Sequence, residues 1–461
     1  MHPADGSPPR VADFFVATPG RGRPPEPGAE MHAVDVGFGG DSETTQVFRI
    51  GEASCAVPGA TAGLKAAHEA YGRMPWRTVL EPAIDLARRG IELTRPQAHL
   101  HAILDLILRH ADEGRRLYSR PDGGRLQPGD TLVLPDLAGT LERISDEGPD
   151  VLYRGELAEQ IVDTVAGGGG TLTRRDLEEY EVVWREPVRV SYHGHEVVSN
   201  PPPSSGGVLI AYGLALLEQV GCGEEGSAEA IAALAEVMRE QTHAREGELD
   251  AERLLADDSV AEAVERVRAG LAGRPEGGPV SGTTHVSVID ADGTAASLSS
   301  STGSGSGVVV PGTAIHLNNM LGEYDLVAGG PAEPGRRLTS MMAPTVVVGP
   351  AGPRLVVGSA GSVRLRGAIM QVIVNVIAHG LPVGEAIDRP RVHVEEAHLH
   401  CEGGFDPASL DRLEELGYDV VRWRRRNLYF GGTNAVEVLP DGSLAAAGDE
   451  RRGGSGLVIS R

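Results

Sequence analysis

The sequence predicts an α+β protein built as a four-layer αββα sandwich, in which helices cover both outer faces of stacked β-sheets. Three observations indicate this class. Residues 60 to 180 carry apolar residues at helical spacing, and residues 227 to 270, rich in Ala, Glu and Arg, keep the same period. After residue 283 the pattern changes to short apolar runs separated by turn residues, which is typical of antiparallel hairpins.

The first helices are predicted between residues 60 and 180. Thr78 to Arg89 places its apolar residues on one face and stops at Gly90, and Gln97 to His110 repeats the pattern. These segments together predict a helical layer.

The middle of the chain is predicted to pass from a strand to long helices. The segment EPVRVSYHGHEVVSN alternates like one strand and ends in PPPSSGG, whose prolines and glycines end a β-ladder. A helix is expected from Val208 to Val220, and further helices over residues 227 to 270. The Gly/Pro-rich run 271 to 282 is the expected segment boundary.

The last third predicts an antiparallel sheet with one long helix. Hairpin turns are expected at Asp292-Gly293, at residues 350 to 352 and at residues 441 to 442. The run RLRGAIMQVIVNVIAHG is apolar along one face and predicts a helix that ends at Gly380.

Composition excludes several classes of protein. The formal net charge of the 461 residues is −23, from 65 acidic and 42 basic residues, which argues against nucleic acid or an anionic membrane as a partner. Cys55, Cys222 and Cys401 are far apart and form no CxxC pair, so neither a disulfide framework nor a metal site is expected. The chain has no apolar run near the ~20 residues of a transmembrane helix, and MHPADGSPPRVADFF lacks the features of a secretion signal. A cytoplasmic location is therefore expected, or a periplasmic or extracellular one if the true start lies upstream.

Thr283 is the candidate nucleophile, because it opens a predicted strand directly after the flexible run that ends at Gly282. A cut between Gly282 and Thr283 would give Thr283 both a hydroxyl and a free α-amino group. An α-amino group has a pKa of about 7.7–8.0, which suits a general base near neutral pH. The alternative from this segment alone is an ordinary strand after an ordinary linker.

The chain resembles the γ-glutamyltranspeptidase family of self-cleaving N-terminal-nucleophile hydrolases. The resemblance covers the chain from about Asp13 onward. It is carried by six blocks in family order: PPPSSGG (201 to 207), TTH (283 to 285), LNN (317 to 319), RRLTSMMAPT (336 to 345), GSAGSVR (358 to 364) and DRPR (388 to 391).

The resemblance implies one composite unit made of two segments. Residues 1–282 would form the large segment and residues 283–461 the small one, which stay associated after the cut. Relatives carry a further Gly/Ala-rich stretch before the block that here reads DFFVATPG. Either the true start lies upstream, or a strand and helices are lost and apolar surface is left exposed.

The resemblance also implies the catalytic residues. The backbone amides of Gly361 and Ser362, just before a predicted helix, would form the oxyanion hole, although the family uses Gly-Gly there. Ser301 stands where the family has a threonine that hydrogen-bonds the nucleophile; a surface serine is the competing interpretation. His285 is expected to pack beside the nucleophile.

The substrate contacts follow from the same resemblance. Glu323 stands where an aspartate holds the α-amino group of the substrate, and Thr339 and Ser340 where two serines bind its α-carboxylate. A solvated loop acid and a polar turn are the alternatives. No metal or cofactor is expected.

Several positions depart from the family. Phe15 replaces the arginine that clamps the α-carboxylate, Gly303 an asparagine, and Met320 a glutamine or glutamate. The segment from Asp325 to Leu338 is short, so no lid over the substrate is expected. These departures bear on the substrate and leave the predicted nucleophile, base and oxyanion hole in place.

The expected function is therefore that of an autoprocessing amidohydrolase or transpeptidase acting on γ-glutamyl amides of the glutathione type. Water or an amine would be the acceptor, and the sequence leaves open which of them dominates, as it does the oligomeric state. One alternative is an amidase of the same fold, like a cephalosporin acylase. Another is an uncut, non-catalytic remnant that serves as a scaffold.

Overall fold

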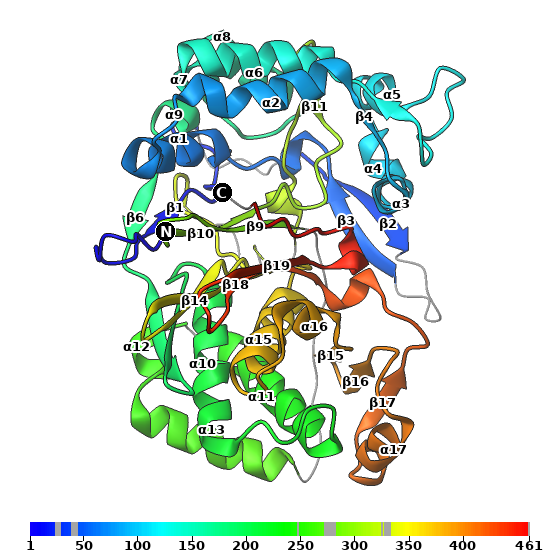
Figure 1. Cartoon of the computed structure of the whole chain (residues 1–461). Helices are drawn as coiled ribbons and strands as arrows, with labels where there is room; N and C mark the ends of the chain where they lie inside the picture. The colour runs from blue at the N-terminus through cyan, green and yellow to red at the C-terminus, as the bar shows by residue number, and fades with distance from the viewer. Residues whose placement is uncertain are drawn as a thin grey trace.

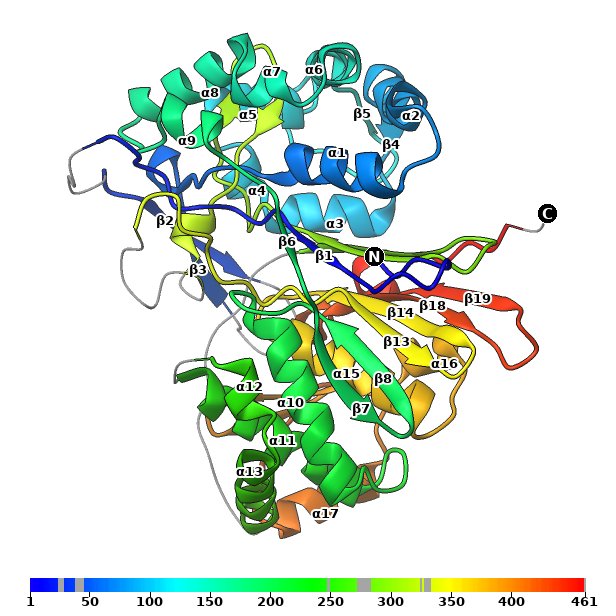
Figure 2. The ribbon, with the colours of Figure 1, turned by 90° about the vertical axis from the view of Figure 1, so that its left-hand side faces the viewer.

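The chain folds into four stacked layers. The computed structural model describes residues 1–23, 29–37, 45–246, 249–271, 283–323, 326 and 333–459. Figure 2 shows a layer of helices, then a two-stranded sheet, then a six-stranded sheet, then a second layer of helices. The predicted αββα order is confirmed. The expected boundary loop covers residues 271 to 282, of which 272–282 lie outside the described residues. Much of the short segment from Asp325 to Leu338, where no lid is expected, also lies outside them.

The larger sheet is antiparallel throughout and contains strands from both sides of Thr283. Its order is β19-β18-β14-β13-β8-β7. The strands are β7 (Val188–Tyr192), β8 (His195–Ser199), β13 (Thr345–Gly349), β14 (Gly352–Ala360), β18 (Gly432–Val438) and β19 (Leu444–Gly448).

The single strand expected over EPVRVSYHGHEVVSN is wrong. The segment forms the hairpin β7–β8, with Tyr192 paired to His195. Both turn residues, His193 and Gly194, have positive φ, 45° and 74°, which matches the twist of a tight hairpin. Alternation continues across the turn, so the pattern of apolar residues alone did not reveal it.

The smaller sheet is the hairpin of β9 (Thr284–Ile289) and β10 (Ala295–Ser300), as predicted. It packs against β14 and β18 of the larger sheet. His2 forms a bridge with Ala295 along the other edge of β10. The outer face of β9 exposes Val286 and Val288, which are 49% and 46% accessible.

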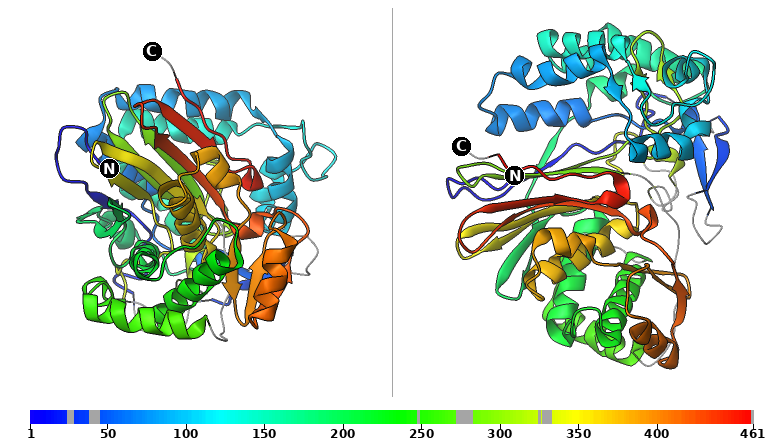
Figure 3. Two further views of the ribbon diagram at one scale, coloured as in Figure 1. Left: turned by 60° about the horizontal axis from the view of Figure 1, so that its bottom comes forward. Right: turned by 45° about the vertical axis from the view of Figure 1, so that its right-hand side comes forward.

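The helical layer on the larger sheet holds the main hydrophobic core. Figure 3 shows α15 and α16 lying along this sheet, with the other helices beside them. The helices are α10 (Ser205–Val220), α11 (Ala228–Glu246), α12 (Ala251–Leu254), α13 (Asp257–Gly270), α15 (Arg364–Ile377) and α16 (Val383–Asp388). Their buried Val, Leu, Ile and Ala side chains pack onto Val347, Leu355 and Val357 of the sheet.

Helix α10 begins three residues earlier than predicted, inside the PPPSSGG block. A Cβ on Gly206 would lie 2.0 Å from the Met341 carbonyl oxygen, and one on Gly207 would lie 2.2 Å from the Asn200 carbonyl oxygen. Glycine therefore allows the first turn of α10 to lie directly against its neighbours.

The second helical layer, at the top of Figure 1, comes from the first part of the chain. The expected helix from Gln97 to His110 is wrong, because the segment breaks at Leu104 into two helices. The layer consists of α1 (Ala60–Tyr71), α2 (Trp76–Arg89), α3 (Arg95–Ile103), α4 (Asp105–Leu108), α5 (Asp112–Tyr118), α6 (Pro135–Glu147), α7 (Asp150–Tyr153), α8 (Glu156–Gly167) and α9 (Arg174–Glu178).

Small sheets complete the molecule. The antiparallel pairs are β1 (Val11–Asp13) with β6 (Val183–Arg185), β2 (His32–Gly37) with β3 (Thr45–Ile50), β4 (Ile91–Glu92) with β5 (Thr131–Leu132), and β11 (Val309–Val310) with β12 (Ile315–His316). A mixed sheet joins β15 (Val392–Glu395), β16 (His398–Cys401) and β17 (Asp419–Arg422), next to α17 (Pro407–Glu415). Within the described residues, no helix has the length and apolarity needed to cross a membrane.

Candidate active site

Thr283 lies immediately before β9, at the end of the hairpin where the two strands separate. The β9–β10 register pairs Thr284 with Ser300, so its continuation by one residue puts Ser301 across from Thr283. Residues opposite each other in an antiparallel pair have Cβ atoms about 4.5–5.5 Å apart. The hairpin thus brings the predicted nucleophile and its predicted hydroxyl partner together. Gly282, on the other side of the predicted cut, lies outside the described residues.

Five of the predicted site residues line one cavity. They are Thr283, Ser301, Glu323, Ser340 and Ser362. The rest of the wall is largely apolar and consists of Phe15, Met320, Leu326, Met341, Met342 and Leu365. The cavity is narrow, about 30 Å³, which is room for roughly two water molecules.

The predicted oxyanion turn precedes α15. Gly361 and Ser362 both have positive φ, 134° and 54°, and their carbonyl oxygens accept hydrogen bonds from the amides of Arg364 and Leu365. A serine in this conformation is strained, and such strain is concentrated at functional sites. The positive end of the α15 dipole adds to the field at this turn. Ser362 lines the cavity, whereas Gly361 is not among the described residues that do.

His285 lies in β9, two residues after Thr283. The side chain is buried, and its Nδ1 and Nε2 atoms each lie 2.9 Å from a serine hydroxyl, those of Ser299 and Ser287. The ring lies directly against Gly358, where a Cβ would be 2.2 Å from the imidazole. Burial lowers the pKa of His285 to about 3, so the ring is neutral at pH 7. The ring therefore packs between the two sheets, and that it also packs against the predicted nucleophile stays a prediction.

Glu323 is a buried acid held in place by backbone. Its Oε1 accepts a hydrogen bond from the Ser304 amide at 3.1 Å, and only 4% of the residue is accessible. Gly303 lies beside it, where a Cβ would be 2.8 Å from Glu323 Oε1 and 2.1 Å from Asn319 Oδ1. Glycine at 303 therefore matches the close approach of these two side chains, which a larger residue would push apart.

The two predicted carboxylate-binding hydroxyls are separated. Ser340 is buried in the cavity wall, and its Oγ accepts a hydrogen bond from the Met342 amide at 3.0 Å. Thr339 is exposed and does not line the cavity. Successive residues of an extended chain point to opposite sides, which accounts for the difference.

Phe15 occupies the cavity wall where the resemblance implied an arginine. Its carbonyl oxygen accepts hydrogen bonds from the Tyr180 hydroxyl at 2.8 Å and from Arg337 at 2.6 Å. Arg337 also forms an ion pair with Asp13, in which its Nε lies 3.3 Å from Oδ1. Among the described residues of the wall, no arginine or lysine is present.

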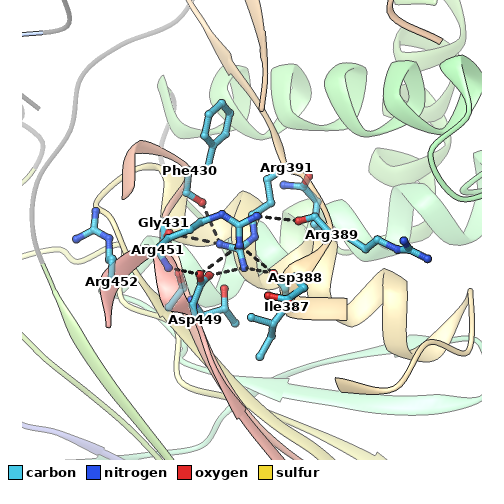
Figure 4. Close-up of polar contacts among 12 residues, drawn as sticks. Ile387, Asp388, Arg389, Arg391, Phe430, Gly431, Asp449, Arg451 and Arg452 are labelled. Atoms are coloured by element: carbon cyan, nitrogen blue, oxygen red, sulfur yellow. Dashed lines mark hydrogen bonds and ion pairs between the residues drawn. The ribbon is translucent and has the colours of Figure 1, made fainter. Parts of the chain in front are cut away.

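A buried ion network that the sequence did not indicate lies next to the predicted oxyanion turn; Figure 4 shows its members. Arg391, from the DRPR block, pairs with Asp449 at 2.7 Å and donates to the carbonyl oxygens of Phe430 and Gly431. A Cβ on Gly361 would lie 3.0 Å from the Cα of Gly431, so this network supports the turn.

Arg451 joins the same network through Glu402 at 2.6 Å and Asp449 at 3.2 Å. Burial alone would raise the pKa of Asp449, but Arg391 and Arg451 outweigh it and hold that pKa below its usual value. These partners are separated by up to sixty residues in the chain, so no local pattern pointed to them. Within the described residues, no group of three His, Cys, Asp or Glu side chains is placed to hold a metal.

Comparison with known proteins gives relatives over most of the chain. The family model described as Gamma-glutamyltranspeptidase matches residues 24–459. The chain is 35% identical over 431 residues to the acylase ACY 1 proenzyme of Pseudomonas sp. (strain V22), covering 89% of this chain and 76% of that protein. It is 33% identical over 433 residues to the glutathione hydrolase proenzyme of Escherichia coli (strain K12), covering 86% and 73%.

A solved structure confirms the fold. Cephalosporin acylase from Bacillus halodurans matches with a TM-score of 0.83 at 23% identity, covering 98% of this chain and 85% of that chain.

Proposed function

Because this chain belongs to the gamma-glutamyltranspeptidase family, we propose that it cuts itself between Gly282 and Thr283 and then transfers or hydrolyses γ-glutamyl groups from amides. The observation that carries the proposal is the convergence of Thr283, Ser301, Glu323 and Ser362 on one cavity. These residues come from separate segments of the chain, and each has the chemistry that the reaction requires.

The self-cleavage supplies the base. The Thr283 hydroxyl adds to the Gly282 carbonyl, the C–N bond breaks, and water hydrolyses the resulting ester. The freed α-amino group has a pKa near ~8 and accepts a proton from Oγ1 in later cycles. The two segments would stay together, because β8 from the first pairs with β13 from the second.

In the catalytic cycle, Oγ1 of Thr283 forms a bond to the γ-amide carbonyl carbon while the amine takes up the hydroxyl proton. The backbone amides of Gly361 and Ser362 hold the oxyanion, which is worth about 3–4 kcal/mol per donor in comparable sites. The proton passes to the leaving nitrogen and the C–N bond breaks, leaving a γ-glutamyl ester. Water or an acceptor amine then attacks the ester and regenerates Thr283.

The acyl group would be held through its amino-acid end. Glu323 offers a buried carboxylate to an α-ammonium group, and Ser340 offers a hydroxyl to the α-carboxylate. Thr339 would contribute only if its exposed side chain turned toward the substrate.

A second candidate is an amidase for a less polar acyl group. Phe15 and Met320 in the cavity wall favour it, because they leave the wall without a cationic partner for a carboxylate. The acylase named among the relatives also supports this candidate.

Intact-mass spectrometry of the purified protein tests the proposal. We expect two species, the first 282 residues and the remaining 179 of the 461. Thr283→Ala should remain a single chain, and Thr284→Ala serves as the control that still cuts. A single uncut wild-type chain after long incubation would contradict the proposal and favour the scaffold alternative.

Turnover separates the two enzymatic candidates. We expect the cut protein to release p-nitroaniline from γ-glutamyl-p-nitroanilide faster than from glutaryl- or phenylacetyl-p-nitroanilide. The reverse order would assign the second candidate.

A further inference from the structure

Arg364 carries a buried charge next to the predicted oxyanion turn. It is the first residue of α15, and only 2% of it is accessible. Its Nε donates a hydrogen bond to the Gly361 carbonyl oxygen at 3.4 Å, and its backbone amide donates to the same oxygen at 3.1 Å. An arginine side chain stays protonated in proteins, so this carbonyl oxygen faces a full positive charge.

The Gly361 carbonyl and the Ser362 amide belong to one peptide unit. This peptide bond is trans, so its C=O and N–H bonds point in opposite directions. Because the carbonyl oxygen faces Arg364, the Ser362 N–H is directed away from Arg364. Ser362 lines the narrow cavity together with Thr283. A hydrogen bond to the carbonyl strengthens the N–H of the same unit as a donor, because the whole peptide group is polarised.

Further contacts fix the guanidinium of Arg364 in this place. Its Cζ lies 4.1 Å from the centre of the Tyr429 ring, a cation–π distance, and the Tyr429 hydroxyl donates to a carboxylate oxygen of Glu395. A second arginine, Arg452, adjoins the same turn, where its Nη2 would lie 3.5 Å from a Cβ on Gly361. Burial and the charge of Arg364 lower the pKa of Arg452 to about 10, so it is still protonated at pH 7. Two positive charges therefore lie next to the turn.

We propose that Arg364 is a positioning residue of the reaction, which polarises the Gly361–Ser362 peptide and so strengthens the Ser362 amide as an oxyanion donor. Arg364 acts through this peptide rather than on the substrate itself. The oxyanion exists only near the transition state, so a stronger donor raises kcat and leaves substrate binding largely unchanged. This inference rests on the proposed function, which places the oxyanion at the Ser362 amide.

The kinetics of Arg364→Met test the proposal. With the p-nitroanilide that the parent turns over fastest, kcat should fall about tenfold, which is part of the ~100- to 1,000-fold that loss of a whole donor costs, while KM stays within about twofold. Arg364→Lys keeps a positive charge and should recover part of this loss. Arg366→Met is the matched control, because Arg366 is also buried in α15 but donates to the Thr242 hydroxyl at 2.6 Å. Equal losses of kcat in Arg364→Met and Arg366→Met, or in Arg364→Met and Arg364→Lys, would refute the proposal.

An NMR measurement on the uncut Thr283→Ala protein separates this inference from the proposed function. With ¹³C at glycine carbonyls and ¹⁵N at serine amides, introduced by cell-free synthesis, only Gly–Ser peptide bonds give a carbonyl–amide correlation, and Ser362→Gly identifies the one from Gly361 by its loss. Arg364→Met should move the Gly361 carbonyl and Ser362 amide-proton resonances upfield, whereas Arg366→Met should leave both in place. Unchanged resonances in Arg364→Met would overturn the inference, whatever the turnover. Shifted resonances in a protein that turns over no anilide would count against the proposed function alone.

Discussion

The buried imidazole of His285 should make the candidate active site sensitive to acid. Its pKa is lowered to about 3 by burial, whereas an unfolded histidine titrates near ~6.5. Below pH ~6.5 the imidazole of His285 therefore binds a proton in the unfolded chain, whereas in the folded chain it does so only near pH 3. The free energy of unfolding consequently falls as the pH is lowered through this window. Each pH unit within this window lowers the free energy of unfolding by about 1.4 kcal/mol. Between pH 7 and pH 5, His285 alone should lower it by about 2 kcal/mol.

Urea unfolding of the uncut Thr283→Ala protein at pH 7 and pH 5 measures this effect. We expect His285→Gln to lower stability at both pH values, because the hydrogen bonds to Ser287 and Ser299 change. Its loss of stability between the two pH values, however, should be about 2 kcal/mol smaller than that of the parent. His99→Gln, at an exposed position of α3, is the matched control. Equal pH dependence in the His285→Gln protein and its parent would refute the reasoning, since the other histidines are common to both.

Three further changes test the site and its support. Glu323→Gln should raise the KM for γ-glutamyl-p-nitroanilide about 10- to 100-fold with a smaller change in kcat, because a charge-assisted hydrogen bond contributes about 1.5–3 kcal/mol; an unchanged KM would remove Glu323 from the acyl site. Arg391→Met leaves Asp449 with one partner fewer and should cost about 3 kcal/mol in urea unfolding, while the double variant with Asp449→Asn should recover part of that loss; no recovery would show that the ion pair is not the cause. Gly303→Asn, which introduces the residue implied by the family, should impair the enzyme, because its Cβ would lie 2.8 Å from Glu323 Oε1 and displace that carboxylate; a gain in kcat/KM would contradict this.

Much of the fold was predictable because its signals are local. The helix from Arg364 follows from apolar residues on one face, and the β9–β10 hairpin from alternation around Asp292-Gly293. The errors also have local causes. The β7–β8 turn lies in a run whose alternation does not change at His193, and the break at Leu104 occurs where the helical pattern continues.

The candidate site was predicted through short blocks and corrected by geometry. Thr283, Ser301, Glu323, Ser340 and Ser362 were all named from the sequence, and the fold brings them to one cavity. The side chains of successive residues can point in opposite directions, however. Thr339 is exposed, whereas the next residue, Ser340, is buried.

The sequence by itself determined the types of secondary structure, the candidate nucleophile and the likeness to one family, because each depends on a few adjacent residues. Only the tertiary structure decided what surrounds Thr283. The Arg391–Asp449 ion pair and the contact of His285 with Gly358 join segments far apart in the chain. Such contacts depend on how complete layers pack, and the energy of burying a charge or an imidazole exists only once that packing has excluded water.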